Sequence, residues 1–447
     1  MSASSPLPQR RILGLIFLTV FMDIIGFSII IPLFPHLLKH YIESEGSIGT
    51  LIGSLNSAAE WMGGDTVFKK TVLFGGLLST LYSLLQFVFS PIWGALSDRL
   101  GRRRILTITL AGNALSYFLW IFAAQFWVVV VTRLFSGMMA GNIAVASAAA
   151  ADITDEKERT KGMAVVGIAI GLGFVFGPVI GGLSSSVQFE NLAHGVSLGL
   201  NPFSVPALIA ASMALLNFIL VVRYFPETLP EDRRAAADAK RPSIFDLATV
   251  NSQSVRRASL ANLIYQVAFT GMENTIVFLT WALFLYSPRD NAWLFLFNGG
   301  CMIVAQGLAR RLTGRMGQRR VTMLGMSLAV VAFLLVASIP HVKAIPGDGH
   351  ATLFYLGLGL ISFATGLILP SISALVSLYS GVSEQGRNLG ILRSAGSLAR
   401  VIGPVTAALL YFHFGSHLWV YVGGALLMLP AIWVVSSLPD PESSATP

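Results

Sequence analysis

The sequence predicts an all-α polytopic membrane protein, with twelve transmembrane helices arranged as two pseudo-symmetric six-helix bundles. Of its 447 residues, 54% are hydrophobic and only 12% are charged, which is about half the charged fraction of a soluble domain. The mean hydropathy is +0.71, and several apolar runs reach the roughly 20 residues that a helix needs to cross a bilayer. Short polar motifs also recur in the two halves, as expected of a repeated bundle.

The twelve expected spans follow from apolar length and from the polar breaks between the runs. In the first half they cover about 12–34, 71–95, 105–124, 127–151, 162–184 and 203–224. In the second half they cover about 257–286, 292–312, 321–339, 351–379, 389–412 and 417–437. The chain therefore divides into an N-terminal bundle (1–225), a cytoplasmic linker (226–256) and a C-terminal bundle (257–447).

Lysine and arginine predict the orientation of these spans, because basic residues favour the cytoplasmic side. The loops on one side hold most of them, including the basic clusters 99–104, 233–241 and 310–320. The loops on the other side hold Lys39, Lys69, Lys70, Arg289 and Lys343. Both termini are therefore expected to be cytoplasmic.

Composition excludes several other function classes. The net charge of +8 does not indicate a nucleic-acid partner, because the basic residues gather beside membrane spans. The single cysteine, Cys301, excludes an internal disulfide and belongs to no metal or redox motif. No P-loop, zincin or nucleophile-elbow pattern occurs, so neither an enzyme nor a nucleotide-driven pump is expected, and no cofactor is implied.

The two halves share degenerate motifs at matching places. Gly101-Arg102-Arg103-Arg104-Ile105 has a partner in Gly317-Gln318-Arg319-Arg320-Val321. Arg159-Thr160-Lys161-Gly162 precedes Gly177-Pro178 at nearly the spacing at which Arg387-Asn388-Leu389-Gly390 precedes Gly403-Pro404. Such internal repetition is what two six-helix halves flanking a midplane site require.

The loop Gly94–Leu106 lies between two apolar runs and combines an aspartate with an arginine cluster. Composition alone predicts a tight turn whose arginines lie at the lipid headgroups. The order of residues resembles the loop 2–3 signature of the major facilitator superfamily, G-x-L-x-D-R-x-G-R-R-x-x-L. The matching residues are Gly94, Asp98, Arg99, Gly101, Arg102 and Arg103. The resemblance implies a gating motif, with Arg393 of the other half and Asp152 as partners.

The fifth span contains small residues at helical spacing: Gly173, Gly177, Pro178, Gly181 and Gly182. Physically, they predict close helix packing and a bend at the proline. The stretch also resembles the helix 5 motif of the superfamily's antiporters, G-x-x-x-G-P-x-x-G-G. An earlier glycine of the longer pattern is replaced by Ala164, which departs from the antiporter pattern.

Away from the span ends, five charged residues fall within the expected spans: Asp23, Arg133, Glu273, Arg393 and Arg400. A charged side chain deep in a membrane span is energetically costly, so each of these residues is a candidate for a functional role. The alternative for each of them is a structural ion pair. Arg133 opens the stretch Arg-Leu-Phe-Ser-Gly, which resembles the helix 4 motif R-x-x-x-G that is linked to proton coupling in antiporters.

Two carboxylates are candidates for carrying a proton. Asp23 precedes Pro32 and Pro35, which resembles the helix 1 motif of twelve-helix drug antiporters. Glu273 lies in the first span of the second half, where apolar surroundings favour the neutral form of a carboxyl group. Asp23, Glu273 and Arg133 are therefore predicted to couple protons. Together with Arg400, which is expected near the midplane, they are also predicted to bind substrate.

Nearly the whole chain resembles the major facilitator superfamily, in its drug:proton antiporter branch. The likeness extends to tetracycline-efflux proteins and to animal tetracycline-transporter-like proteins, which are associated with organic-anion efflux. It implies a monomeric carrier in the plasma or cell inner membrane that exports an amphiphilic small molecule, as in multidrug efflux, by proton antiport with alternating access. Its expected partners are the small-molecule substrate, protons and membrane lipids. The alternative is an organic-anion or lipid transporter without proton coupling; a non-transporting scaffold would not need buried midplane charges.

Overall fold

The computed structural model describes residues 9–45, 49–154, 159–187, 199–229, 231–234, 250, 252–344, 349–380 and 385–440. These residues form helices and no strands, and twelve helical segments are long and apolar enough to cross a membrane. The all-α prediction with twelve spans is confirmed. Most of the predicted linker 226–256 lies outside the described residues.

The first half contains six spans. They are α1 (Gln9–Ser28) continued by η1 (Ile31–Leu33) and α2 (Phe34–Glu45), α4 (Val67–Leu100), α5 (Arg102–Ile121), α6 (Phe126–Met139) continued by α7 (Asn142–Asp152), α8 (Arg159–Ser184) and α9 (Ser204–Tyr224). Two short helices, α3 (Leu51–Trp61) and α10 (Glu231–Arg234), lie outside the spans.

The second half contains the other six: α11 (Gln253–Phe284), α12 (Pro288–Met316), α13 (Gln318–Ala337), α14 (His350–Leu378), α15 (Gln385–Phe414) and α16 (Leu418–Ser436). Several helices are longer than predicted. For example, α4 begins at Val67, where the Thr66 side chain caps it, and ends at Leu100, before Gly101.

Two spans of the first half are broken rather than continuous. The first span is interrupted after Ser28 by the 3-10 turn η1, which has a proline near its start. The fourth was expected as one helix over 127–151, but it divides between Met139 and Asn142. At this break the Trp93 indole N–H donates to the Met138 carbonyl at 2.6 Å, which satisfies a backbone group near the helix end. Interruptions of this kind shape cavities within helical membrane proteins.

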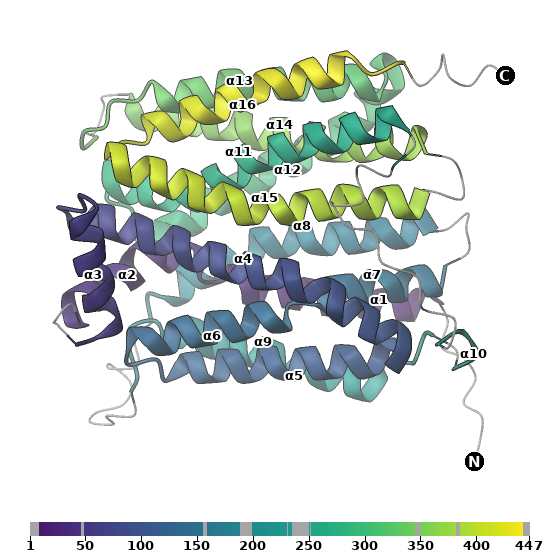
Figure 1. Cartoon of the computed structure of the whole chain (residues 1–447), viewed down its shortest axis with the longest axis horizontal. Helices are drawn as coiled ribbons and strands as arrows, with labels where there is room; N and C mark the ends of the chain where they lie inside the picture. Colours follow the sequence, from purple (N-terminus) through teal and green to yellow (C-terminus); the bar gives the residue numbers. More distant parts are fainter. Residues whose placement is uncertain are drawn as a thin grey trace.

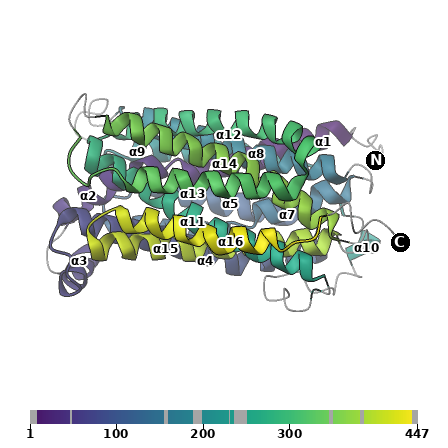
Figure 2. The same cartoon turned by 90° about the horizontal axis from the view of Figure 1, so that it is seen from above.

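Figures 1 and 2 show the spans running roughly along one direction, with α1 beginning and α16 ending at the same end of the bundle. We call this the terminal end and the other the opposite end. Within the halves, α5 packs on α9 and α11 packs on α15. The halves meet where α4 packs on α15 and α8 packs on α12.

The halves are interlocked at the opposite end by glycines. A Cβ atom added to Gly76 of α4 would meet the Ala408 side chain and the Pro404 carbonyl oxygen of α15. One added to Gly182 of α8 would meet the backbone and side chains at the start of α12. Further towards the terminal end, residues 84–93 of α4 are all exposed or half-buried. The two halves are therefore packed most closely at the opposite end.

Aromatic and histidine rings add to this closure. The ring of Phe68, at the start of α4, lies 5.7 Å from that of Trp281 on α11 and 5.3 Å from that of Tyr411 on α15. Beside them, the Nδ1 atoms of His341 and His417 are 2.9 Å apart, and His417 is completely buried. A buried pair of this kind favours neutral imidazoles, because one must accept a hydrogen bond from the other.

The glycines of α8 pack that helix against α1 in the same half. A Cβ on Gly177 would meet the Ser28 hydroxyl, and the Ile25 carbonyl oxygen would lie 3.0 Å away. A Cβ on Gly181 would meet the Ile29 backbone. The small residues thus allow backbone-to-backbone contact, as their spacing predicts.

Replacing Gly177 with alanine is expected to lower the thermal unfolding midpoint of the detergent-purified protein. Overpacking at such a contact costs about 1–3 kcal/mol, more than the gain of about 1 kcal/mol from better helix propensity. The matched control is Gly167→Ala on the same helix, where a Cβ meets nothing within 4 Å. Equal midpoints for the two variants would contradict the close packing.

The histidine pair predicts an acid-sensitive fold. Burial, and next the neighbouring His341, lower the pKa of His417 from 6.5 to about 4. Between these values the unfolded chain holds a proton that the folded chain does not, so stability falls as pH drops from 6.5 to 4, by on the order of 3 kcal/mol. Thermal unfolding at pH 7 and pH 5 should show this loss. It should shrink in His417→Gln and persist in His413→Gln, which changes an exposed histidine; the reverse pattern would refute the assignment.

Candidate functional site

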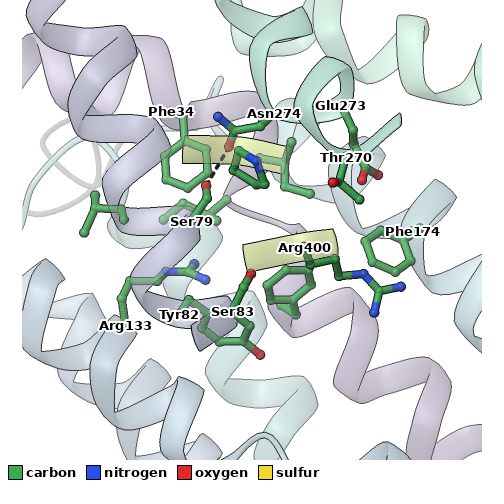
Figure 3. A pocket seen from close by; sticks show the side chains of 15 residues that line it. Phe34, Ser79, Tyr82, Ser83, Arg133, Phe174, Thr270, Glu273, Asn274 and Arg400 are labelled. Carbon is green, nitrogen blue, oxygen red and sulfur yellow. Dashed lines mark hydrogen bonds between the residues drawn. The ribbon is translucent and has the colours of Figure 1, made fainter. Parts of the chain in front are cut away.

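A cavity lies between the two halves. Its walls come from α1, η1, α2, α4, α6 and α8 of the first half and from α11 and α15 of the second. Aromatic and aliphatic side chains form much of the lining. The charged residues among them are Arg133, Glu273 and Arg400, all three predicted as site residues (Figure 3).

Arg400 and Glu273 come from neighbouring helices of the second half and interact electrostatically. Neither has a hydrogen bond or an ion pair within the part of the chain that the structure describes, and both are half-buried. The Arg400 guanidinium lies over the Phe174 ring of α8, 5.9 Å from its centroid, so this contact joins the halves. Both charged groups are therefore available to a ligand.

Arg133 projects into the same cavity from α6 in the first half. Its guanidinium lies 5.4 Å from the centre of the Trp120 ring. The residue is 6% exposed, and its Nη2 atom is buried without a hydrogen-bond partner among the described residues. A buried cation with an unsatisfied donor is costly unless an anionic group meets it.

Polar groups without charge complete the lining. The Ser79 hydroxyl of α4 donates to the Asn274 side-chain oxygen of α11 at 2.6 Å, which is a second contact between the halves (Figure 3). The Asn274 side-chain nitrogen is buried and has no hydrogen-bond partner in the part of the chain that the structure describes. Tyr82 lies close enough to Arg133 and Arg400 to interact with both electrostatically. Ser79, Asn274 and Tyr82 were not predicted as site residues. The sequence signal that could have revealed them is a hydroxyl or amide side chain inside an apolar span.

Asp23 occupies a different environment from the one predicted. It is not among the cavity-lining residues; its carboxylate accepts hydrogen bonds from the side-chain amides of Asn113 at 2.9 Å and Asn142 at 2.8 Å. Asn142 in turn accepts from the Thr109 hydroxyl. Asp23 is therefore held in a polar network inside the first half. Sequence reasoning missed the two asparagines, although both lie within predicted spans.

The loop motif forms an ionic network within the first half. The Arg102 side chain, 7% exposed, donates from Nε to Asp152 at 2.9 Å and from Nη1 to Asp98. The Ser97 hydroxyl accepts a further bond from Nη1 at 2.7 Å. Gly101 permits the turn, because its φ of 97° is a conformation that other residues rarely adopt. Of the predicted motif residues, Asp98, Arg102 and Asp152 are thus brought together.

Glu227, which the sequence placed in a linker, caps the helix that follows this motif. Its carboxylate accepts hydrogen bonds from the backbone N–H groups of Arg102 at 2.8 Å and Arg103 at 3.3 Å. A carboxylate at a helix N-terminus is favoured by the unpaired N–H groups and by the helix dipole. The segment after α9 therefore fixes the start of α5.

Arg393 was expected to reach Asp98 from the second half. Its Nη1 atom instead lies 3.4 Å from the Ser147 hydroxyl of α7, and it has no ion pair among the described residues. With the halves closed at the opposite end, this hydrogen bond joins them nearer the terminal end. The predicted latch between Arg393 and Asp98 stays a prediction for the other conformation.

Residues 16–281 and 261–447 match the family model described as Major Facilitator Superfamily. The chain belongs to this superfamily. It is thus an integral membrane transporter, in agreement with its twelve apolar helices. The glycine and arginine motifs above are those by which the sequence resembled the superfamily.

Three relatives of this superfamily member are informative. Major facilitator superfamily domain-containing protein 10 of Mus musculus is 32% identical, over 95% of this chain and 92% of the relative. Tetracycline resistance protein, class E, of Escherichia coli is 26% identical, over 96% of this chain and 95% of the relative. The crystal structure of the human organic anion transporter MFSD10 (TETRAN) matches with a TM-score of 0.73 and 29% identity, covering 96% of this chain and 100% of that one.

Replacing Arg102 with glutamine in this transporter is expected to lower its thermal unfolding midpoint strongly. The substitution leaves two carboxylates, Asp98 and Asp152, without their shared cation, and breaking such a buried pair costs about 3–5 kcal/mol. Arg104→Gln, which changes an exposed arginine of the same turn, is the control. A midpoint for Arg102→Gln within error of that for Arg104→Gln would show that the network does not stabilise the fold.

Proposed function

We propose that this chain is a proton-coupled secondary transporter that carries amphiphilic organic anions by alternating access. The observation that carries this proposal is the charge of the cavity shared by the two halves. Two arginines line it against one carboxylate, Glu273. A cavity with an excess of positive charge favours an anionic ligand.

The cavity also suits the amphiphilic part of such a substrate. Phe27, Phe34 and Phe174 offer apolar surface, while the arginines can form charge-assisted hydrogen bonds to a carboxylate or sulfonate. The similarity to a human organic anion transporter supports this substrate class. The similarity to tetracycline resistance proteins supports drug-like molecules as well.

Alternating access requires the two halves to separate at one end while they close at the other. The basic loops favour a cytoplasmic position for the terminal end, with both termini. On this assignment the interlocked opposite end faces outwards, which supports an inward-facing conformation in the plasma or inner membrane. The network of Asp98, Arg102 and Asp152 then orders the cytoplasmic loop, and Arg393 joins it when that side closes.

The antiporter-like glycine stretch of α8 favours export by proton antiport. Such antiport needs a carboxyl group whose proton affinity differs between the two states. Glu273 shares the cavity with the substrate, whereas Asp23 is held by two amides in the first half. Arg133 and Arg400 are the cations placed to influence these acids. An organic-anion or lipid carrier without proton coupling is the alternative.

Glu273→Gln is expected to abolish pH-gradient-driven accumulation of a labelled organic anion in proteoliposomes, while exchange of the same anion down its own gradient continues. Asp23→Asn tests the second acid in the same assay, and Glu231→Gln, which changes an acid whose side chain is 90% exposed, is the control. Loss in one variant identifies the coupling acid. Full gradient-driven activity in both would favour the uncoupled carrier.

A further inference from the structure

The charges of the cavity do not balance unless a ligand completes them. Arg133 reaches it from the first half and Arg400 from the second, and Glu273 is the one carboxylate among the described residues that line it. An ionised Glu273 leaves one positive charge in excess, and a protonated Glu273 leaves two. A ligand with two anionic groups therefore neutralises the site when Glu273 carries a proton.

The two arginines are set up to hold separate groups. Arg133 has a buried Nη2 atom with no partner, and Arg400 forms no hydrogen bond or ion pair among the described residues. Each guanidinium instead lies over an aromatic ring, Trp120 or Phe174, which holds it without using its donors. Tyr82 lies within electrostatic range of both arginines. Each guanidinium therefore keeps donors for one anionic group of a ligand.

Glu273 and Arg400 attract each other electrostatically at the cavity, so a group that binds to Arg400 also acts on Glu273. An anion bound to Arg400 cancels this attraction and repels the carboxylate, so Glu273 takes up a proton. Anion and proton thus strengthen each other's binding. In proton antiport through the same carboxylate, substrate and proton would instead exclude one another.

We propose that the cavity binds an organic molecule with two anionic groups, one at Arg133 and one at Arg400, together with a proton on Glu273, so that molecule and proton cross the membrane in the same direction. This inference rests on the proposed organic-anion function. In this inference the proton moves with the substrate, whereas in the antiport favoured by the α8 stretch it moves against the substrate.

Other titratable groups near Glu273 do not change this balance. Tyr265 lies on the same helix, α11, and donates its hydroxyl proton to Thr365 at 2.8 Å, while Tyr82 faces the cavity from α4. From α15 the facing charge is Arg400, and from α2 the lining residue is Phe34. Neither α14 nor α16, which also pack on α11, has a described residue in the cavity wall.

Naphthalene-1-sulfonate and naphthalene-1,5-disulfonate are suitable probes, because sulfonates stay ionised and any pH dependence then belongs to the protein. Calorimetric titration of the purified transporter should give binding of the disulfonate about tenfold tighter than that of the monosulfonate, the value of one additional charge-assisted hydrogen-bonded contact. Arg133→Gln and Arg400→Gln should each remove this preference. Arg310→Gln, which changes an exposed arginine, should retain it.

The proton is tested with the same probes. Disulfonate binding should weaken as pH rises from 6 to 8, and this dependence should vanish in Glu273→Gln but persist in Glu231→Gln. In proteoliposomes loaded by a disulfonate gradient, a pH electrode should record alkalinisation of the weakly buffered outer medium as the probe enters. Size-exclusion profiles and unfolding midpoints verify that each variant is folded, and Arg400→Lys should retain part of the preference because it keeps the charge.

The outcomes separate the two proposals. If the transporter binds and moves neither sulfonate, the organic-anion function itself is wrong. If it moves both with equal affinity, keeps its pH dependence in Glu273→Gln, or acidifies the outer medium during disulfonate entry, the organic-anion function stands and the joint binding of a dianion and a proton is overturned.

Discussion

The cost of placing charge inside a bilayer governs this molecule more than any other interaction. An arginine or carboxylate within a span has to face protein or water rather than lipid, and the two halves offer that shelter where they meet. Arg133, Glu273 and Arg400 all lie in that shared cavity. Since they are not paired with one another within 4.0 Å, the same constraint that sends them inward leaves them open to a ligand. The cost of placing charge in lipid thus explains both why these residues lie inside the protein and why they are accessible to a ligand.

Burial of charge takes two contrasting forms in the first half. Arg102 is surrounded by Asp98, Asp152 and the Ser97 hydroxyl, so its donors are used within the protein. Arg133 keeps a buried donor unused beside the ring of Trp120. The first arrangement stabilises a turn, and the second leaves a guanidinium donor available to a ligand. This contrast supports a structural role for Arg102 and the proposed ligand-binding role for Arg133.

The sequence predicted the spans well because each is encoded locally, by apolar length and by the polar residues that end it. It also singled out Arg133, Glu273 and Arg400, which line the cavity, since a charge in an apolar run is conspicuous. It did not show that Asn113 and Asn142 bind Asp23, or that Ser79 and Phe174 face the second half, because nearly uniformly apolar helices do not reveal which face turns inward. Glu227 escaped notice because a cap on α5 depends on how the chain returns after α9.

The closure at the opposite end rests on the absence of side chains. Gly76 against Ala408 and Gly182 against the start of α12 hold the halves together by fit between backbones. Contacts of this type carry no net charge, and mobile ions screen only charged interactions. The contact between the halves at this end therefore depends little on ionic strength, whereas salt would weaken the proposed ion pair between Arg393 and Asp98 at the other end. Salt should therefore weaken closure at only one end of this carrier and favour the conformation in which the glycines meet.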